Sequence, residues 1–209
     1  MISLNGNIQV SNKFGKISKL DRLNFSPARR VLLAFVLIVL GILGRTVFQI
    51  GENIEFVTSA SLLAASFLGL RWTVIVPLVI MAVSDFIIGN TLIFLFTWSA
   101  YLLTGLLGLF FLTKKSGIIN HVLKASGTGV ISSIIFYLWT NFGVWALDSF
   151  GMYPDDLSGL IQSYIMGIPF FKANLYGNLI FVPLSFFIFH LCLYLQSEKS
   201  SLKKILFSN

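Results

Sequence analysis

Long apolar runs constrain the fold of this chain more than any other feature. The first extends from Val31 to about Ile50. About 20 helical residues at 1.5 Å each give about 30 Å, the thickness of the hydrocarbon core of a bilayer. Further runs cover residues 55–70, 73–89, 91–112, 124–147 and 174–195. We therefore predict an all-α, polytopic membrane protein with six transmembrane helices.

The composition also indicates a membrane protein. Hydrophobic residues make up 56% of the chain and charged residues 11%, against about 45–50% and about 25% in soluble domains. The first apolar run is longer than the roughly 7–15 residues of a signal peptide, and no small-x-small cleavage site follows it. We expect it to remain as an uncleaved helix. Cys192 is the only cysteine, which excludes an intramolecular disulfide.

Basic residues predict the orientation of the helices. The net charge is +7, and six of the 15 Lys and Arg residues precede the first apolar run. With the N-terminus in the cytoplasm, 13 of these cations lie inside and only Arg45 and Lys172 lie outside, as the positive-inside rule requires. We predict an N-in, C-in membrane domain at 31–195 between basic cytoplasmic tails at 1–30 and 196–209. The N-terminal cations therefore indicate topology and not nucleic-acid binding.

A shorter apolar segment lies before the last predicted span. Residues 160–171 are too few to cross a bilayer, and Pro169 near their end is poorly tolerated inside a helix. We predict a short half-helix on the outer side, which would line or cover a cavity. An interfacial helix without a specific role is the alternative.

Several common chemistries lack their motifs. The chain has no P-loop and no His-Glu-x-x-His pattern. His121 and His190 lie at the cytoplasmic ends of predicted spans, without a second ligand nearby in sequence. We expect two interfacial histidines in a wet layer, and neither a metal site nor a cofactor.

Polar and aromatic residues gather at one depth, in the outer third of the predicted spans. Such residues are costly in a membrane and by default mark function, so we predict a substrate cavity that opens outward. Its candidate residues are Asn53, Glu55, Asp85, Trp98, Tyr101, Asn141, Trp145, Asn174 and Asn178.

These candidates have structural alternatives. Asp85 would either contact substrate, take part in proton coupling or pair with Arg45, which ends the first span at a similar depth. Asn141 and Asn178 would bind a ligand or join helices by hydrogen bonds. Trp98 and Trp145 are deeper than an interfacial aromatic belt, which favours pocket walls.

A stripe of small residues marks the second predicted span. Ala60 and Ala64 are four residues apart and share one helical face, which allows another helix to approach closely. That helix would belong either to this chain or to a partner subunit, for which Ala60 and Ala64 would form the docking surface.

Several short motifs resemble those of a known family. They are Asn53 to Ala60, Pro77 to Asp85, Thr140 to Trp145, Tyr153-Pro154, Ile168 to Phe171 and Asn174 to Asn178. Over residues 31–195 the chain resembles a prokaryotic integral membrane family of unknown function. That family is similar to the substrate-binding S components of energy-coupling-factor (ECF) vitamin transporters. Glu52 replaces an expected proline, and Asn178 replaces an expected acid.

The resemblance implies a non-enzymatic subunit of an importer in the prokaryotic plasma membrane. It would capture a vitamin-like small molecule at the outer face and dock on a transmembrane coupling subunit with two ATPase subunits. One alternative is a membrane enzyme for lipid or isoprenoid substrates, with Asp85 and Glu55 as acid and base. Another is a non-catalytic assembly partner. The identity of the substrate is not encoded in any motif of the chain.

Overall fold

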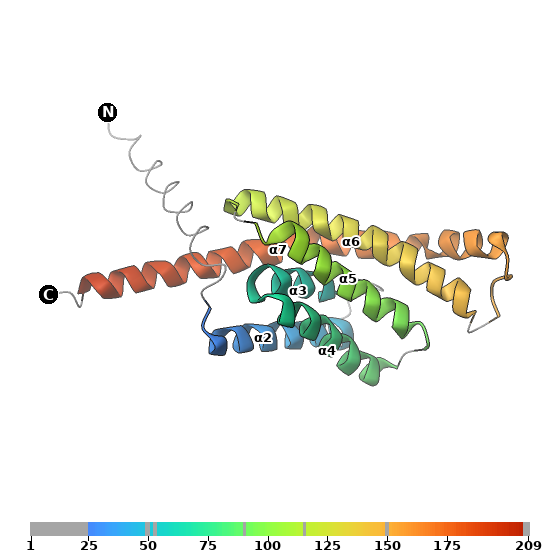
Figure 1. Ribbon diagram of the computed structural model, residues 1–209, viewed down its shortest axis with the longest axis horizontal. Coiled ribbons are helices and arrows are strands. Elements are labelled where there is room, and N and C mark those ends of the chain that lie inside the picture. The colour runs from blue at the N-terminus through green and yellow to red at the C-terminus, as the bar shows by residue number, and fades with distance from the viewer. Residues whose placement is uncertain are drawn as a thin grey trace, which may run out of the picture.

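The computed structural model describes residues 25–48, 51, 54–89, 91–114, 116–148 and 151–206, with side chains described up to residue 198. Its elements are α2 (Pro27–Thr46), α3 (Val57–Leu63), the π-helix η1 (Ala64–Leu68), α4 (Leu70–Ile88), α5 (Phe94–Leu112), α6 (Ile118–Leu147) and α7 (Leu157–Leu206) (Figure 1). Every element of the described part of the chain is a helix, which confirms the all-α prediction.

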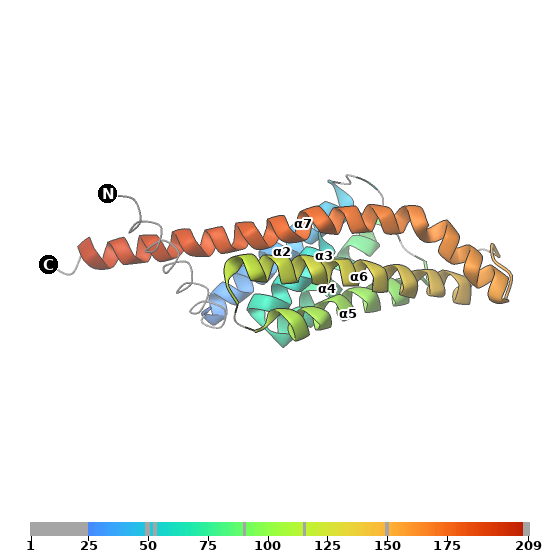
Figure 2. The same cartoon turned by 90° about the horizontal axis from the view of Figure 1, so that it is seen from above.

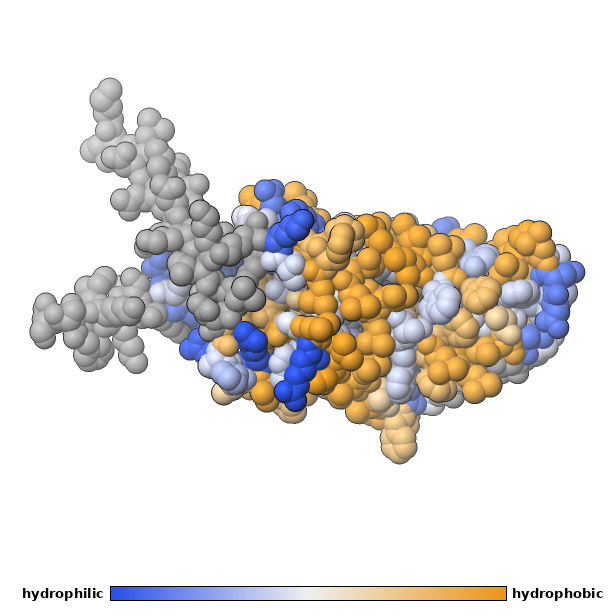
Figure 3. Space-filling view, viewed as in Figure 1, coloured by the Kyte–Doolittle hydropathy of each residue, from blue (hydrophilic) through white to orange (hydrophobic). Residues whose placement is uncertain are grey.

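Five helices, α2, α4, α5, α6 and α7, are long and apolar enough to cross a membrane. On the face shown in Figure 3, large apolar side chains cover the middle, and polar residues gather toward the two ends. Such a belt is expected where lipid chains surround a protein. The structure therefore supports a multi-pass membrane protein.

The apolar run at 55–70 forms a shorter helix than predicted. α3 and η1 together cover only Val57 to Leu68, about 18 Å at 1.5 Å per residue. All twelve of these residues are buried. The predicted second span is therefore a short helix in the interior of the bundle, where small side chains allow other helices to surround it. Gly69, with a φ of 91°, ends η1 and begins α4.

The prediction of a separate half-helix at 160–171 is wrong. α7 runs without interruption through Pro169 and Pro183 to Leu206. A proline inside a helix removes one backbone hydrogen bond and can bend the helix without ending it. Figure 2 shows such a bend in the orange part of α7. The apolar segment at 160–171 is therefore the first part of the longest helix.

Successive helices run in opposite directions and pack side by side. α6 lies along α7 in both views, and α2 lies beside α4. A Cβ added to Gly108 of α5 would lie 2.8 Å from Ala65 Cβ, so glycine permits the close approach of α5 to η1. α3 and η1 lie in the centre of this bundle and supply much of its buried core.

The two ends of the bundle differ in charge. Arg29 lies at the start of α2, Arg71 at the start of α4 and Lys114 just after α5. This is the end of the bundle where α2 begins and α7 ends, on the left of Figure 1. Asp148, Asp155 and Asp156 flank the connection between α6 and α7, at the opposite end. We call these two regions the basic end and the acidic end.

Candidate functional site

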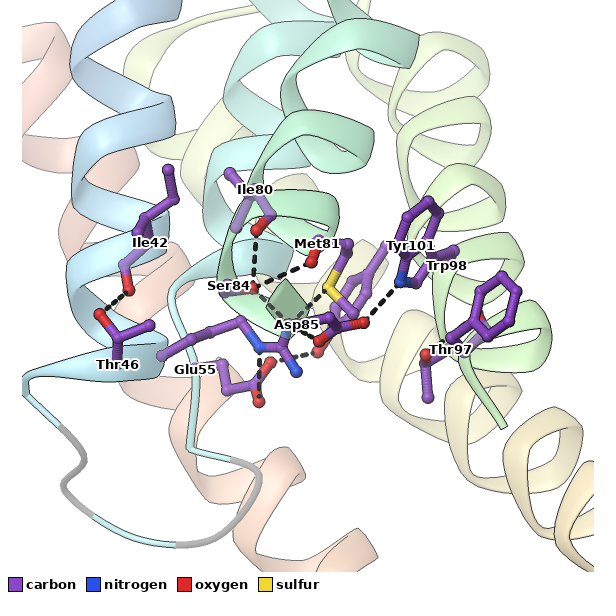
Figure 4. Close-up of polar contacts among 12 residues, drawn as sticks. Ile42, Thr46, Glu55, Ile80, Met81, Ser84, Asp85, Thr97, Trp98 and Tyr101 are labelled. Atoms are coloured by element: carbon purple, nitrogen blue, oxygen red, sulfur yellow. Dashed lines mark hydrogen bonds and ion pairs between the residues drawn. The ribbon is translucent and has the colours of Figure 1, made fainter. Parts of the chain in front are cut away.

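A charged network lies toward the acidic end, where α2 and α4 finish. Arg45 Nη1 donates to Asp85 Oδ1 at 2.7 Å and to Ser84 Oγ at 2.6 Å (Figure 4). Its Nε lies 3.1 Å from Glu55 Oε1, on the segment before α3. Side-chain exposure is 10% for Arg45, 17% for Glu55 and 7% for Asp85. One guanidinium therefore serves two carboxylates in a nearly buried site.

Two aromatic side chains of α5 complete this network. Trp98 Nε1 donates to Asp85 Oδ2 at 2.6 Å, and Tyr101 OH donates to Glu55 Oε2 at 2.8 Å. Each carboxylate thus accepts from an aromatic side chain as well as facing Arg45. Buried charges are tolerated when they are paired and hydrogen-bonded in this way. The Asp85–Arg45 pair was one of the alternatives predicted from the sequence, and it is the one present here.

A cavity of about 440 Å³ lies beside this network, between α5, α6, α7 and the α6–α7 connection. Its volume is within the range of small-molecule sites, about 300–1,000 Å³. It is lined by Thr97, Ser133, Phe136, Tyr137, Thr140, Asn141, Val144, Met152, Tyr153, Met166, Gly167, Phe170, Phe171 and Asn174. None of these described lining residues is charged at neutral pH. Two of the predicted site residues, Asn141 and Asn174, are among them.

Asn178 lies behind the cavity wall and orients part of it. Its Nδ2 donates to Ser133 Oγ at 2.8 Å and to Asn174 Oδ1 at 3.0 Å. Asn178 is 2% exposed and does not line the cavity itself. It joins α7 to α6 and holds the amide of Asn174. Of the two alternatives predicted for Asn178, the structure has the hydrogen bond between helices.

The side chain of Asn141 is held from two directions. Its Nδ2 donates to the carbonyl oxygen of Tyr137 at 2.8 Å, one turn earlier in α6. Across the helix interface, a Cβ added to Gly167 of α7 would overlap the Asn141 amide. Glycine at 167 therefore gives this amide the space in which it faces the cavity.

The network and the cavity share a boundary. The ring of Tyr101 packs against that of Phe136, with centroids 5.0 Å apart, and Phe136 lines the cavity. Thr97 lines the cavity directly before Trp98 in α5. The network therefore contacts one wall of the cavity through the ring of Tyr101, and its charged groups are not part of the lining.

Three further predicted residues, Trp145, Ala60 and Ala64, lie away from the cavity. Trp145 is half-buried, donates to the carbonyl oxygen of Pro154 at 3.0 Å and does not line the cavity. Asn53 lies outside the described residues. Ala60 and Ala64 are both 0% exposed, so neither presents a surface to a partner subunit. Their stripe packs inside this chain, the other alternative predicted for it.

A second polar cluster lies near the basic end, and the sequence analysis did not predict it. His121 Nδ1 and His190 Nε2 lie 2.9 Å apart, and Ser66 Oγ of η1 lies 2.9 Å from His121 Nε2. The histidines are 0% and 4% exposed, so the prediction of two water-exposed, interfacial histidines is wrong. Both histidines were placed at the cytoplasmic ends of antiparallel spans, and this common depth could have indicated that they meet.

The histidine cluster is surrounded by aromatic rings. Phe67 contacts both imidazoles, with centroids 5.5 Å from His121 and 5.6 Å from His190. Among the described residues, no group of three or more His, Cys, Asp or Glu side chains is arranged to hold a metal ion. The cluster is a buried hydrogen-bonded chain that joins η1, α6 and α7.

Comparison with known proteins gives a match to a protein family. Residues 25–202 match the profile of a family of unknown function, DUF6580. Neither a curated protein nor a solved structure matches this chain. The matched segment contains α2 to α6 and α7 as far as residue 202, with the charged network and the cavity. This protein therefore belongs to the DUF6580 family.

Proposed function

We propose that this protein is the substrate-binding membrane subunit of an importer of the ECF type. The observation that carries the proposal is the cavity between α5, α6 and α7. It is of ligand size, it lies toward the acidic end, and uncharged polar groups alternate with aromatic rings in its described lining. Sites of this composition bind small organic molecules.

The proposed topology is N-in and C-in, with the cavity in the outer half of the membrane. The cations Arg29, Arg71 and Lys114 at the basic end support a cytoplasmic location of that end. The short α3–η1 segment would count as the second of six membrane segments. Reporter fusions after Lys114 and Ser201 should then be cytoplasmic, and a fusion at Asp156 should be external. An external signal from the Lys114 fusion would contradict this topology.

Energy would come from separate chains, because the sequence has no P-loop. A transmembrane coupling subunit and two ATPases would bind the bundle and drive release of the substrate to the cytoplasm. Since Ala60 and Ala64 are buried, the docking surface would lie on other residues. The proposed location is the plasma membrane of a prokaryote.

A membrane enzyme for lipid or isoprenoid substrates is supported less well. Its proposed acid and base, Asp85 and Glu55, are both engaged by Arg45, and neither lines the cavity. A general acid or base must reach the reacting group of the substrate. The arrangement therefore favours binding over catalysis.

Co-purification tests this proposal most directly. The affinity-tagged protein would be solubilised from its native membranes in a mild detergent, and its partners and small-molecule cargo identified by mass spectrometry. We expect a polytopic coupling protein, two P-loop ATPases and a bound small molecule. An unrelated tagged polytopic protein from the same membranes serves as control. Purification alone, without partner or bound molecule, would contradict the importer function.

A further inference from the structure

We infer that the cavity selects an uncharged, planar heteroaromatic molecule that carries an amide or lactam edge, and that it rejects charged analogues of that molecule. This inference rests on the proposed function, because it names the substrate class of the same cavity. Three properties of the cavity lead to it: the charge of its lining, the arrangement of its rings and the hydrogen-bonding groups of Asn141.

Charge is the first property. No described residue of the lining carries a charge at neutral pH. The cation of the neighbouring network, Arg45, already faces Asp85 and Glu55. Lys172 on α7 is exposed and absent from the lining. A carboxylate, phosphate or ammonium group would therefore lose its water without gaining an opposite charge, which is strongly unfavourable.

The aromatic walls are the second property. Phe136 and Tyr137 come from α6, and Phe171 comes from α7. The rings of Tyr137 and Phe171 lie 4.9 Å apart between centroids, at 39° to each other. These two rings therefore pack against each other and form one aromatic wall of the cavity, against which a flat ring can make offset-stacked or edge-to-face contacts. An aliphatic chain would use the same surface less specifically.

The third property is the amide of Asn141. An asparagine amide has two N–H donors and one carbonyl acceptor. One N–H donates to the carbonyl oxygen of Tyr137. Within the part of the chain that the structure describes, Oδ1 and the second N–H have no other hydrogen-bond partner, so both can serve a ligand. The complementary group is a donor beside an acceptor, as in a carboxamide, a lactam or the imide edge of a flavin or pyrimidine. A ligand without this edge would displace water from the partly buried amide of Asn141 and leave it unpaired.

Matched pairs of probes separate charge from shape. The purified full-length protein would be titrated with nicotinamide and nicotinate, and with riboflavin and its 5′-phosphate, by calorimetry and by intrinsic fluorescence. Each pair shares its ring and differs in charge. Thiamine supplies a cationic ring. We expect at least one uncharged probe to bind roughly tenfold or more tightly than its anionic partner, and thiamine to bind no better than the anions.

Two variants link the selectivity to the cavity. Asn141→Asp keeps the size of the side chain but replaces a donor by a negative oxygen, so it should weaken binding of the uncharged probe at least tenfold. Trp145→Phe, which changes a residue outside the lining, should leave the affinity unchanged. Circular dichroism and gel filtration would establish that both variants are folded. Equal binding by wild type and Asn141→Asp would overturn the inference.

The outcomes distinguish failure of the inference from failure of the proposed function. Equal or tighter binding of nicotinate, the flavin phosphate or thiamine would overturn the substrate class and leave an importer subunit standing. If no probe binds, charged or uncharged, and no ATPase co-purifies, both the substrate class and the importer function are overturned. If no probe binds but the ATPases do co-purify, the substrate class alone is overturned.

Discussion

The charged network and the cavity are neighbours, but the polar groups of the network are paired with one another, whereas those of the cavity border open space. In the network, Arg45, Asp85, Glu55, Trp98 and Tyr101 contact one another. In the cavity, the side chains of Asn141 and Tyr153 border open space. Polar residues in a membrane protein are costly in either setting. The comparison indicates that those paired with each other hold the helices together, whereas those facing a void are available to a ligand.

Removal of Arg45 is the largest predicted perturbation of the network. Arg45→Met would leave the carboxylates of Asp85 and Glu55 buried without their cation. We expect a loss of about 3–5 kcal/mol in the free energy of unfolding, the typical cost of breaking one side of a buried ion pair. Denaturant titration in detergent measures it, and Arg71→Met, an exposed cation at the basic end, is the matched control. Equal stability of the two variants would show that the network is not structural.

A smaller change in the same network tests its aromatic donors. Tyr101→Phe removes the hydroxyl that donates to Glu55 and keeps the ring that packs on Phe136. We expect a loss of about 1.5–3 kcal/mol in stability, the usual value for a hydrogen bond to a charged group. Ligand affinity should change by less than about twofold, since the cavity wall is retained. A large loss of affinity with normal stability would place Tyr101 in the binding site.

The cavity should show the reverse pattern. Asn141→Ala removes the amide that faces the cavity, so it should weaken ligand binding by about 1 kcal/mol, roughly fivefold, the net value of one hydrogen bond. Thermal stability should fall less than in Arg45→Met. Binding would be followed with the tightest uncharged probe. If Asn141→Ala instead unfolds the protein and Arg45→Met does not, the assignment of the two regions is reversed.

The smallest predicted effect is at Trp145, which belongs to neither region. Trp145→Phe removes one hydrogen bond to the carbonyl oxygen of Pro154 in the α6–α7 connection. A partly exposed backbone oxygen can bond to water instead, so we expect about 0.5 kcal/mol or less in stability. Ligand affinity should be unchanged. A fivefold or greater loss of affinity would mean that the connection closes over the cavity when the ligand binds.

The depth of the polar residues could be predicted from the sequence, but their partners could not. Counting residues from helix ends places Asp85, Trp98 and Asn141 toward one face of the membrane, and the structure has all three in the half of the bundle near the acidic end. Which of them meet depends on the rotation of each helix about its axis. The sequence does not reveal that rotation, because lipid and the protein interior are both apolar and the two sides of each helix therefore differ little in hydrophobicity.

Two regions of the fold illustrate the same limit. Hydropathy correctly marked the long helices, because a bilayer demands about 20 apolar residues with all backbone groups paired. It could not distinguish a lipid-facing span from the buried α3–η1 segment, since both are apolar. It also divided α7 at Pro169, although packing along α6 keeps this helix continuous.

The sequence by itself therefore determined that this protein is a helical membrane protein with its cations concentrated toward one end and a polar layer toward the other. Those properties follow from composition and from distance along the chain. Only the tertiary structure decided that Arg45 pairs with Asp85 and Glu55, that His121 meets His190, and that Asn141 faces a cavity. Each of these depends on contacts between helices far apart in sequence, which hydrophobic pattern alone does not encode.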